Sequence, residues 1–227
     1  MILEAIKYSN NFYLRHFFKM VYVCTIPILI LSVIPLLQAN LDPSSTFIFQ
    51  AVLQLLSAFF QLVLISVTIM LVNDLHFNRP QSLLNYLFKS VFFIPTLFLT
   101  SMTVGLAVLA GFLLILPGIY LLGRFVFIQY VVVLEGKKFF EAFNISQHYA
   151  RNKAWLYGLT IFFIVFLFII FLSILTILLS LIFPFPDGDT IPLFIIFLLS
   201  TFTYITFQFY FCIFIYRIFL FEKEISD

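Results

Sequence analysis

The sequence predicts an all-α, polytopic membrane protein with six transmembrane helices arranged as three hairpins. Of its 227 residues, 63% are hydrophobic and 10% are charged, whereas charged residues make up about a quarter of a soluble domain. Residues 154–186 and 191–216 contain no charged residue. Uncharged apolar runs of about 18 residues or more are typical of transmembrane helices. A soluble helical core is excluded, because so few polar residues would not cover its surface.

Residues 1–19 are predicted to form a helix that lies in the membrane surface, with its apolar side in lipid. Its polar residues recur at intervals of three and four and share one helical face: Glu4, Lys7, Asn11 and Arg15. We expect the first span at residues 20–38 and the second at residues 46–73. The polar run at 40–45 is typical of the turn between them.

The middle of the chain is predicted to contribute a second surface helix, at residues 81–89, and a second hairpin. Residues 90–123 carry no charge. As one straight helix they would extend roughly 50 Å, against an apolar membrane core of about 30 Å. The chain must therefore fold back, and Pro117 and Gly118 form the predicted hairpin turn. The predicted spans are residues 91–116 and 119–134.

The last third repeats this arrangement of a surface helix followed by a hairpin. Residues 135–153 form the predicted surface helix, and spans five and six are expected at residues 155–183 and 191–219. We treat residues 1–227 as one integral membrane domain. The domain divides into three parts of similar organisation: residues 1–73, 74–134 and 135–221. They are either related repeat units or the pattern that any array of hairpins with surface linkers produces.

Basic residues lie before the first span, between spans two and three, between spans four and five, and at the end of the chain. The other three connections, at residues 40–45, 117–118 and 184–189, contain neither Lys nor Arg. Because basic loops stay on the cytoplasmic side, both termini are predicted to be cytoplasmic.

The sequence offers no pattern that predicts catalysis. The three histidines, His16, His76 and His148, lie in different segments, and none stands at metal-ligand spacing from Cys, Asp or Glu. The predicted spans contain no acidic residue for intramembrane hydrolysis. We therefore expect no enzyme activity, no metal or cofactor and no nucleic-acid partner.

Polar residues inside the predicted spans form the candidate intramembrane site. The candidate residues are Gln50, Gln54, Gln61, Arg124, Gln129 and Gln208. Two interpretations are open. These side chains either form hydrogen bonds that hold the helices together, each contributing about 1 kcal/mol, or line a solute pathway. Burying Arg124 at mid-membrane costs about 3 kcal/mol, and the apolar residues of the same span offset this cost. The Arg124 side chain is expected either to reach headgroup phosphate or to pair with amides.

The third surface helix supplies the predicted contacts with anionic lipid. Its basic residues are Lys137, Lys138, Arg151 and Lys153, each worth about 1 kcal/mol near an anionic leaflet. Phe139, Phe140 and Phe143 share one side, and they are expected to be buried in the membrane boundary or against the spans. Membrane lipids are the expected partners, and other membrane proteins are further candidates.

One region resembles a known family. The quoted residues are Leu116-Pro117-Gly118-Ile119-Tyr120, Glu135-Gly136, Ala142, Ser146 and Arg151-Asn152. They look like a region of YciC-type bacterial inner-membrane proteins, and are similar to the membrane domain fused to some glycerophosphodiester phosphodiesterases. The resemblance implies a six-helix bacterial inner-membrane protein of unestablished function, with no site residues to transfer. A non-enzymatic structural or lipid-interacting role is therefore the leading hypothesis. The alternative is a small-solute transporter or channel-like protein.

Overall fold

The computed structural model describes residues 2–39, 47–182 and 190–226. Within these residues all regular structure is helical, which confirms the predicted all-α membrane class. The helices are α1 (Ile2–Val23), α2 (Thr25–Ala39), α3 (Phe47–His76), α4 (Leu83–Phe112), α5 (Leu116–Arg124), α6 (Ile128–Glu135), α7 (Phe139–Ala150), α8 (Ala154–Ile182) and α9 (Thr190–Ser226).

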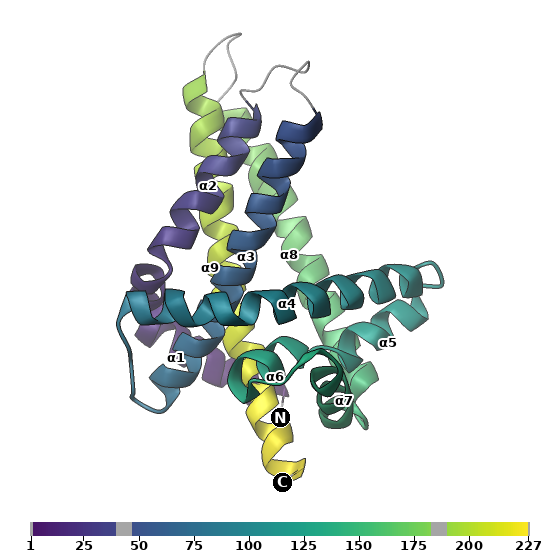
Figure 1. The fold of residues 1–227 in the computed structure, drawn as a ribbon. Coiled ribbons are helices and arrows are strands. Elements are labelled where there is room, and N and C mark those ends of the chain that lie inside the picture. Colours follow the sequence, from purple (N-terminus) through teal and green to yellow (C-terminus); the bar gives the residue numbers. More distant parts are fainter. Residues whose placement is uncertain (1, 40–46, 183–189, 227) are drawn as a thin grey trace.

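Two groups of helices run in different directions (Figure 1). Helices α2, α3, α8 and α9 run along the long direction of the molecule, and we call them the upright helices. Helices α1, α4 and α5 lie across that direction, nearer the end at which α3 and α9 terminate, which we call the basal end. The transverse helices pack on the upright ones: α1 contacts α9, α4 contacts α3, and α5 contacts both α4 and α8.

Five segments among the described residues are long and apolar enough to span a membrane. They are residues Phe47–His76, Leu83–Phe112, Leu116–Glu135, Ala154–Leu179 and Leu198–Ile225. A sixth is present if α1 and α2, which meet at an angle of 71°, are counted as one bent span. Span five, predicted at residues 155–183, corresponds to α8. Span six, predicted at 191–219, continues as one helix to Ser226.

The bend between α1 and α2 falls at Cys24, so the upright part of the first predicted span begins later than residue 20. Pro27 has no N–H to donate to the carbonyl of Val23 and so favours a break here. The Thr25 hydroxyl donates instead to the carbonyl oxygens of Val21 and Tyr22, at 3.0 and 2.8 Å. These bonds satisfy carbonyls that lose helical partners at the bend.

The middle of the chain differs in detail from its prediction. The predicted surface helix at residues 81–89 and the span after it form one continuous helix, α4. The chain then reverses at Leu113–Ile115, where Ile115 has a φ of 58°, and Pro117 stands in the first turn of α5. Proline suits that position because an N–H there has no helical partner. The reversal therefore lies just before Pro117 and Gly118.

The next predicted span, residues 119–134, is divided into α5 and α6 by a break at residues 125–127. The α4–α5 hairpin lies across the upright helices, whereas α2 with α3 and α8 with α9 form upright pairs (Figure 1). The hypothesis of three related units stays a prediction.

Glycines allow α5 to approach both of its neighbours closely. A Cβ atom on Gly118 would lie 2.7 Å from the ring of Phe112 in α4, and one on Gly123 would lie 2.5 Å from the backbone nitrogen of Gly158 in α8. Both distances are shorter than real Cβ contacts. The α5–α8 contact is thus a backbone-to-backbone crossing of the small-residue kind used by membrane helices.

The best-buried part of the structure is where α3, α6 and α9 meet. Leu64, Val67, Val131, Phe209 and Ile213 are fully buried there. By contrast, only 6% of the most apolar stretch of α8 and 17% of that of α4 are buried. The outer faces of α4 and α8 are therefore apolar surfaces suited to lipid.

Candidate functional site

A cavity of about 190 Å³, with a largely apolar wall that carries several amide and hydroxyl groups, lies between α3, α6 and α9. We call it the amide cavity, because three glutamines contribute to its wall. Its polar lining residues are Gln61, Thr68, Gln129, Tyr130, Tyr204, Gln208 and Cys212. Apolar residues of these helices, with Val126 from the break before α6, complete the wall. None of the described residues that line it is charged.

Hydrogen bonds join two walls of the amide cavity. Gln61 Nε2 donates to the Tyr204 hydroxyl at 2.8 Å and to Gln208 Oε1 at 3.1 Å, so α3 is tied to α9. Tyr130 donates to the backbone carbonyl of Cys212 at 2.8 Å, which ties α6 to α9. Gln208 Nε2, although buried, has no hydrogen-bond partner in the part of the chain that the structure describes.

The structure brings together only part of the predicted intramembrane set. Gln61, Gln129 and Gln208 line the amide cavity. Gln50 and Gln54 lie in the first turns of α3 and are exposed. The glutamines on α3 are four and seven residues apart, which predicts that they share one helical face. That face continues past the end of the packed core.

Arg124, the sixth predicted member, lies at the end of α5 and points to α7 rather than to the amide cavity. Its Nη2 donates to Gln147 Oε1 at 2.9 Å, and its Nη1 to the Tyr120 hydroxyl at 3.3 Å. The backbone carbonyl of Arg124 also accepts a hydrogen bond from Ser146, at 3.3 Å. The guanidinium thus pairs with an amide of the surface helix, and the amides of α3 are not its partners.

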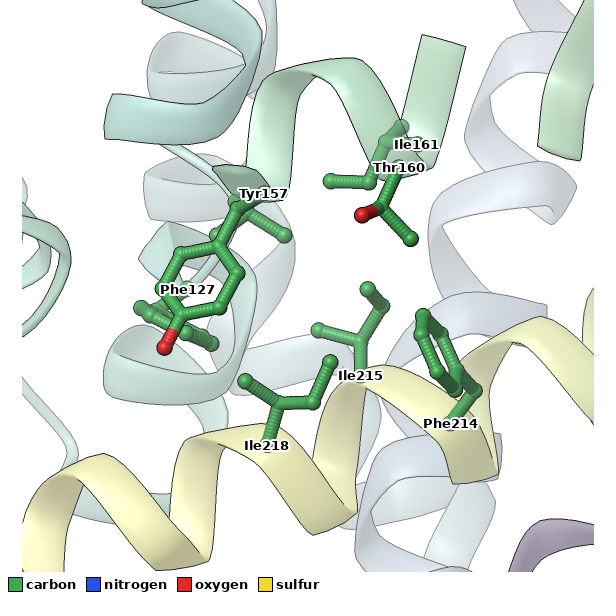
Figure 2. Close-up of a pocket in the computed structure, with 8 residues that line it drawn as sticks. Phe127, Tyr157, Thr160, Ile161, Phe214, Ile215 and Ile218 are labelled. Carbon is green, nitrogen blue, oxygen red and sulfur yellow. The ribbon is translucent and has the colours of Figure 1, made fainter. Parts of the chain in front are cut away.

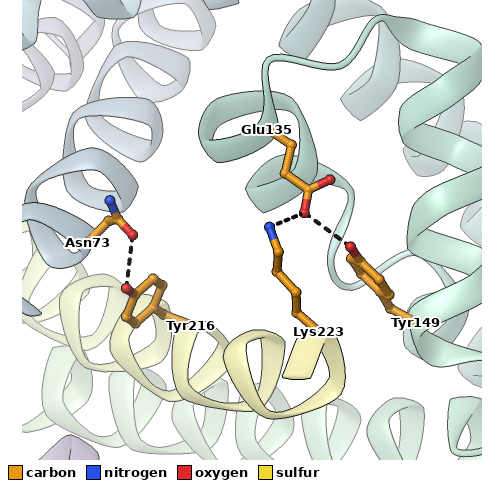
Figure 3. A network of polar contacts seen from close by, with 5 residues as sticks. All are labelled: Asn73, Glu135, Tyr149, Tyr216 and Lys223. Atoms are coloured by element: carbon orange, nitrogen blue, oxygen red, sulfur yellow. Dashed lines mark hydrogen bonds and ion pairs between the residues drawn. The ribbon is translucent and has the colours of Figure 1, made fainter. Parts of the chain in front are cut away.

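Sequence reasoning missed a network of charged and phenolic groups around the basal part of α9 (Figure 3). Lys223 donates to Glu135 at 2.9 Å, Tyr149 donates to the same carboxylate at 3.1 Å, and Tyr216 donates to Asn73 at 2.9 Å. A second buried carboxylate, Glu222, accepts hydrogen bonds from Lys153 and Tyr157. The network fastens α9 to α3, α6, α7 and α8.

The predicted lipid-contact residues divide in two. Lys138 and Arg151 are exposed and Lys137 is half-buried, so these three are accessible for headgroup contact. Lys153 is engaged instead, because its Nζ lies 2.5 Å from Glu222 Oε1. Of the phenylalanines on this helix, Phe140 is exposed, while Phe143 packs against Phe125 with ring centroids 5.1 Å apart.

A second hollow of about 300 Å³ lies at the basal end between α1 and the end of α3. We call it the basal basic pocket. It is lined by Tyr8, Asn11, Phe12, Arg15, His16, Leu75, His76 and Asn78. The Tyr8 hydroxyl and His76 Nδ1 share a hydrogen bond of 2.7 Å. Asn78 has a φ of 54° and turns the chain directly after α3.

A third hollow, between the start of α8 and the basal part of α9, is an apolar packing contact rather than a site (Figure 2). Its lining includes Phe127, Phe214 and Ile218. The only hydroxyl groups around it belong to Tyr157 and Thr160, and both already donate hydrogen bonds, to Glu222 and to the carbonyl of Leu156. No space for a water-sized molecule remains inside it.

Among the described residues no group of three His, Cys, Asp or Glu side chains is placed to hold a metal ion. No family model, curated protein or solved structure matches the chain. The resemblance to YciC-type proteins therefore stays a prediction. Its quoted residues have structural roles here: Gly136 ends α6 in a left-handed conformation, and Ala142 and Ser146 are buried residues of α7.

Proposed function

We propose that the chain is a non-enzymatic, multi-pass membrane protein that interacts with lipid, and that its basal basic pocket binds anionic headgroups. In this proposal the protein resides in a bacterial inner membrane with its basal end and both termini in the cytoplasm. The distribution of Lys and Arg supports that orientation, because the connections at residues 77–82 and 136–138 are basic and lie at the basal end.

The charge of the basal basic pocket is the observation that carries the proposal. Arg15, His16 and His76 line one hollow, and no Asp or Glu is among its lining residues. A second guanidinium, that of Arg217, lies 5.0 Å from the ring centroid of Tyr8, which is one of the residues that line the pocket. One opposing charge, that of Glu224, acts on His76. Phosphate oxygens accept hydrogen bonds from guanidinium, imidazole and amide groups, and basic pockets between membrane helices suit lipid headgroups.

The surroundings of the pocket favour a lipid over a free anion. Leu14 and Phe18 on α1 and Phe77 after α3 are exposed. An amphipathic helix in the membrane surface places such residues among acyl chains and its polar face among headgroups. A phosphate in the basal basic pocket would then lie at the level of the other headgroups, and the exposed apolar residues would contact its acyl chains.

Lipid retention in mild detergent tests this proposal. The variant Arg15→Gln should retain about fivefold less phosphatidylglycerol than the parent, in line with the loss of about 1 kcal/mol for one permanently charged group. The matched control is Lys89→Gln, which removes one exposed basic residue of α4 that lies outside the pocket. Mass spectrometry of the intact complexes reports the bound lipid.

Equal retention by the two variants would contradict the pocket as the site. Inorganic phosphate added to the parent complex should leave the lipid bound, because phosphate gains nothing from the exposed apolar residues. Displacement by phosphate alone would identify the site as one for a free anion.

Small-solute transport is a second candidate function, and the amide cavity is the observation that favours it. Proteoliposomes containing the protein should then swell faster than protein-free vesicles in an inward gradient of glycerol or urea. Equal swelling rates would exclude transport of these solutes.

A further inference from the structure

We infer that the amide cavity is a hydrated binding site for a small, uncharged molecule that carries both hydrogen-bond donors and acceptors. This inference does not depend on lipid binding at the basal basic pocket. It rests on the depth of the cavity, on an unmet hydrogen-bonding group and on the absence of charge in its wall.

The cavity lies at mid-membrane depth. Gln61 is the fifteenth of the 30 residues of α3, so it is about 22 Å from either end of that helix at about 1.5 Å per residue. An apolar membrane core is about 30 Å thick, and Gln61 therefore stands near its middle. A polar group at that depth, with neither water nor a protein partner, costs several kcal/mol.

Hydrogen bonds that hold the helices together account for only part of the polar groups in the cavity wall. Gln61 and Tyr204 are used in the link from α3 to α9, and Thr68 donates to the carbonyl of Leu64 at 2.7 Å. Gln208 is different, because its buried Nε2 is left without a partner among the described residues. Reversing this amide would leave its oxygen unpartnered instead. The link from α3 to α9 uses only the Oε1 of Gln208 and does not account for its Nε2, so the unmet group points to an occupant.

The size and neutrality of the cavity define that occupant. A volume of about 190 Å³ corresponds to about six water molecules at about 30 Å³ each. No ionised side chain lines the wall, and the one charge predicted for this region, Arg124, is paired with Gln147 on α7. An ion would be desolvated here without a counter-charge. Amides and hydroxyls match a neutral solute of the amide, urea or polyol class.

The chain carries its own reporter for this site. Both thiols are buried. Cys212 lines the amide cavity, whereas Cys24 lies behind its wall, with its Sγ 3.8 Å from the hydroxyl of Thr68. The variant Cys24→Ala leaves Cys212 as the only thiol, and Cys212→Ala leaves Cys24 as the matched control. Both full-length variants are treated in lipid nanodiscs with the small neutral reagent 2-hydroxyethyl methanethiosulfonate, and modification is followed by intact mass.

Cys212 should react about tenfold faster than Cys24, because a buried thiol without access to water is inert. Glycerol, urea or acetamide should slow the reaction of Cys212, whereas sodium chloride of equal osmolarity should not. Labelling of Cys212 as slow as that of Cys24, or labelling that none of the three neutral solutes slows, would overturn the inference.

A substitution separates the binding site from structural glue. Gln208→Leu removes the unpartnered Nε2 together with the Oε1 that accepts from Gln61. It should weaken protection by the neutral solutes severalfold and change thermal stability little, because Gln61 keeps its bond to Tyr204. Gln54→Leu, at an exposed position on α3, is the matched control and should leave protection intact. A Gln208→Leu variant that unfolds at lower temperature but keeps full protection by the solutes would show that this amide is glue.

Discussion

Replacing Gly158 with alanine should destabilise the protein through one backbone crossing. Gly158 of α8 faces α5 so closely that a Cβ atom would overlap the carbonyl oxygen of Ile119 and lie 2.9 Å from its carbonyl carbon. Ordinary Cβ contacts begin at about 3.4 Å. Helices α5 and α8 must therefore move apart by more than half an ångström, because the obstacle is backbone and has no rotamer to change.

The cost follows from that displacement. Overpacking a well-packed contact typically costs about 1–3 kcal/mol, and a backbone obstacle places this substitution in the upper part of that range. For a chain of this size, about 2 kcal/mol lowers the unfolding temperature by about 4–8 °C. Stabilities of folded proteins are only about 5–15 kcal/mol, so the effect is a large fraction of the total.

Thermal unfolding in one detergent, read by intrinsic fluorescence, measures the difference. Gly105→Ala is the matched control, because Gly105 lies inside α4, seven residues before its end, with no atom within 4 Å of a new Cβ. There alanine should raise stability by up to about 1 kcal/mol through its higher helix propensity. The two substitutions are therefore expected to act in opposite directions. If Gly158→Ala unfolds at the same temperature as Gly105→Ala, the close crossing of α5 and α8 is refuted.

Three further predictions concern charged residues. Glu222→Ala should lower the free energy of unfolding by about 3 kcal/mol, because it leaves the partners of a buried carboxylate unpaired. The control Glu224→Ala, at an exposed position, should change it little. Similar unfolding temperatures of the two variants would contradict this prediction. Arg124→Leu should make the free energy of membrane insertion more favourable by about 3 kcal/mol at most. The variant should nevertheless unfold at a lower temperature, because the hydrogen bond to α7 is lost. An unchanged unfolding temperature would mean that this bond does not contribute to stability. Reporters fused after Arg79 and Asp189 should read as cytoplasmic and external respectively, and an external signal at Arg79 would reverse the proposed orientation.

Periodicity and apolar runs predicted most helices because these features are local. Span five coincides with α8 to within a residue, and the surface helix inside residues 135–153 is α7. The break between α5 and α6 carries neither proline nor glycine, so no local signal marked it. The direction of α4 was also beyond prediction, since a helix that lies along a membrane has the same apolar residues as one that crosses it.

The amide cavity could be predicted only in part. Helical spacing placed Gln61 on one face with Gln50 and Gln54, but spacing within one helix does not reveal where the neighbouring helix ends. Gln61 meets Gln208 across 147 positions of sequence, a contact set by packing and invisible to local pattern. The α5–α8 crossing did have a signal, the small pair Ala154 and Gly158 one turn apart in α8, which is typical of closely packed membrane helices.

The transverse hairpin of α4 and α5 gives the molecule unequal widths at its two ends (Figure 1). With the upright helices along the membrane normal, the hairpin displaces lipid on the basal side of the bundle and leaves the opposite side narrow. Its tip is formed by exposed apolar residues, Leu113, Leu114 and Ile115, which suit acyl chains better than water. A body of this shape expands one monolayer more than the other. We therefore expect each copy inserted in this way to act as a wedge, and a membrane crowded with such copies to bend toward the leaflet that holds their narrow ends.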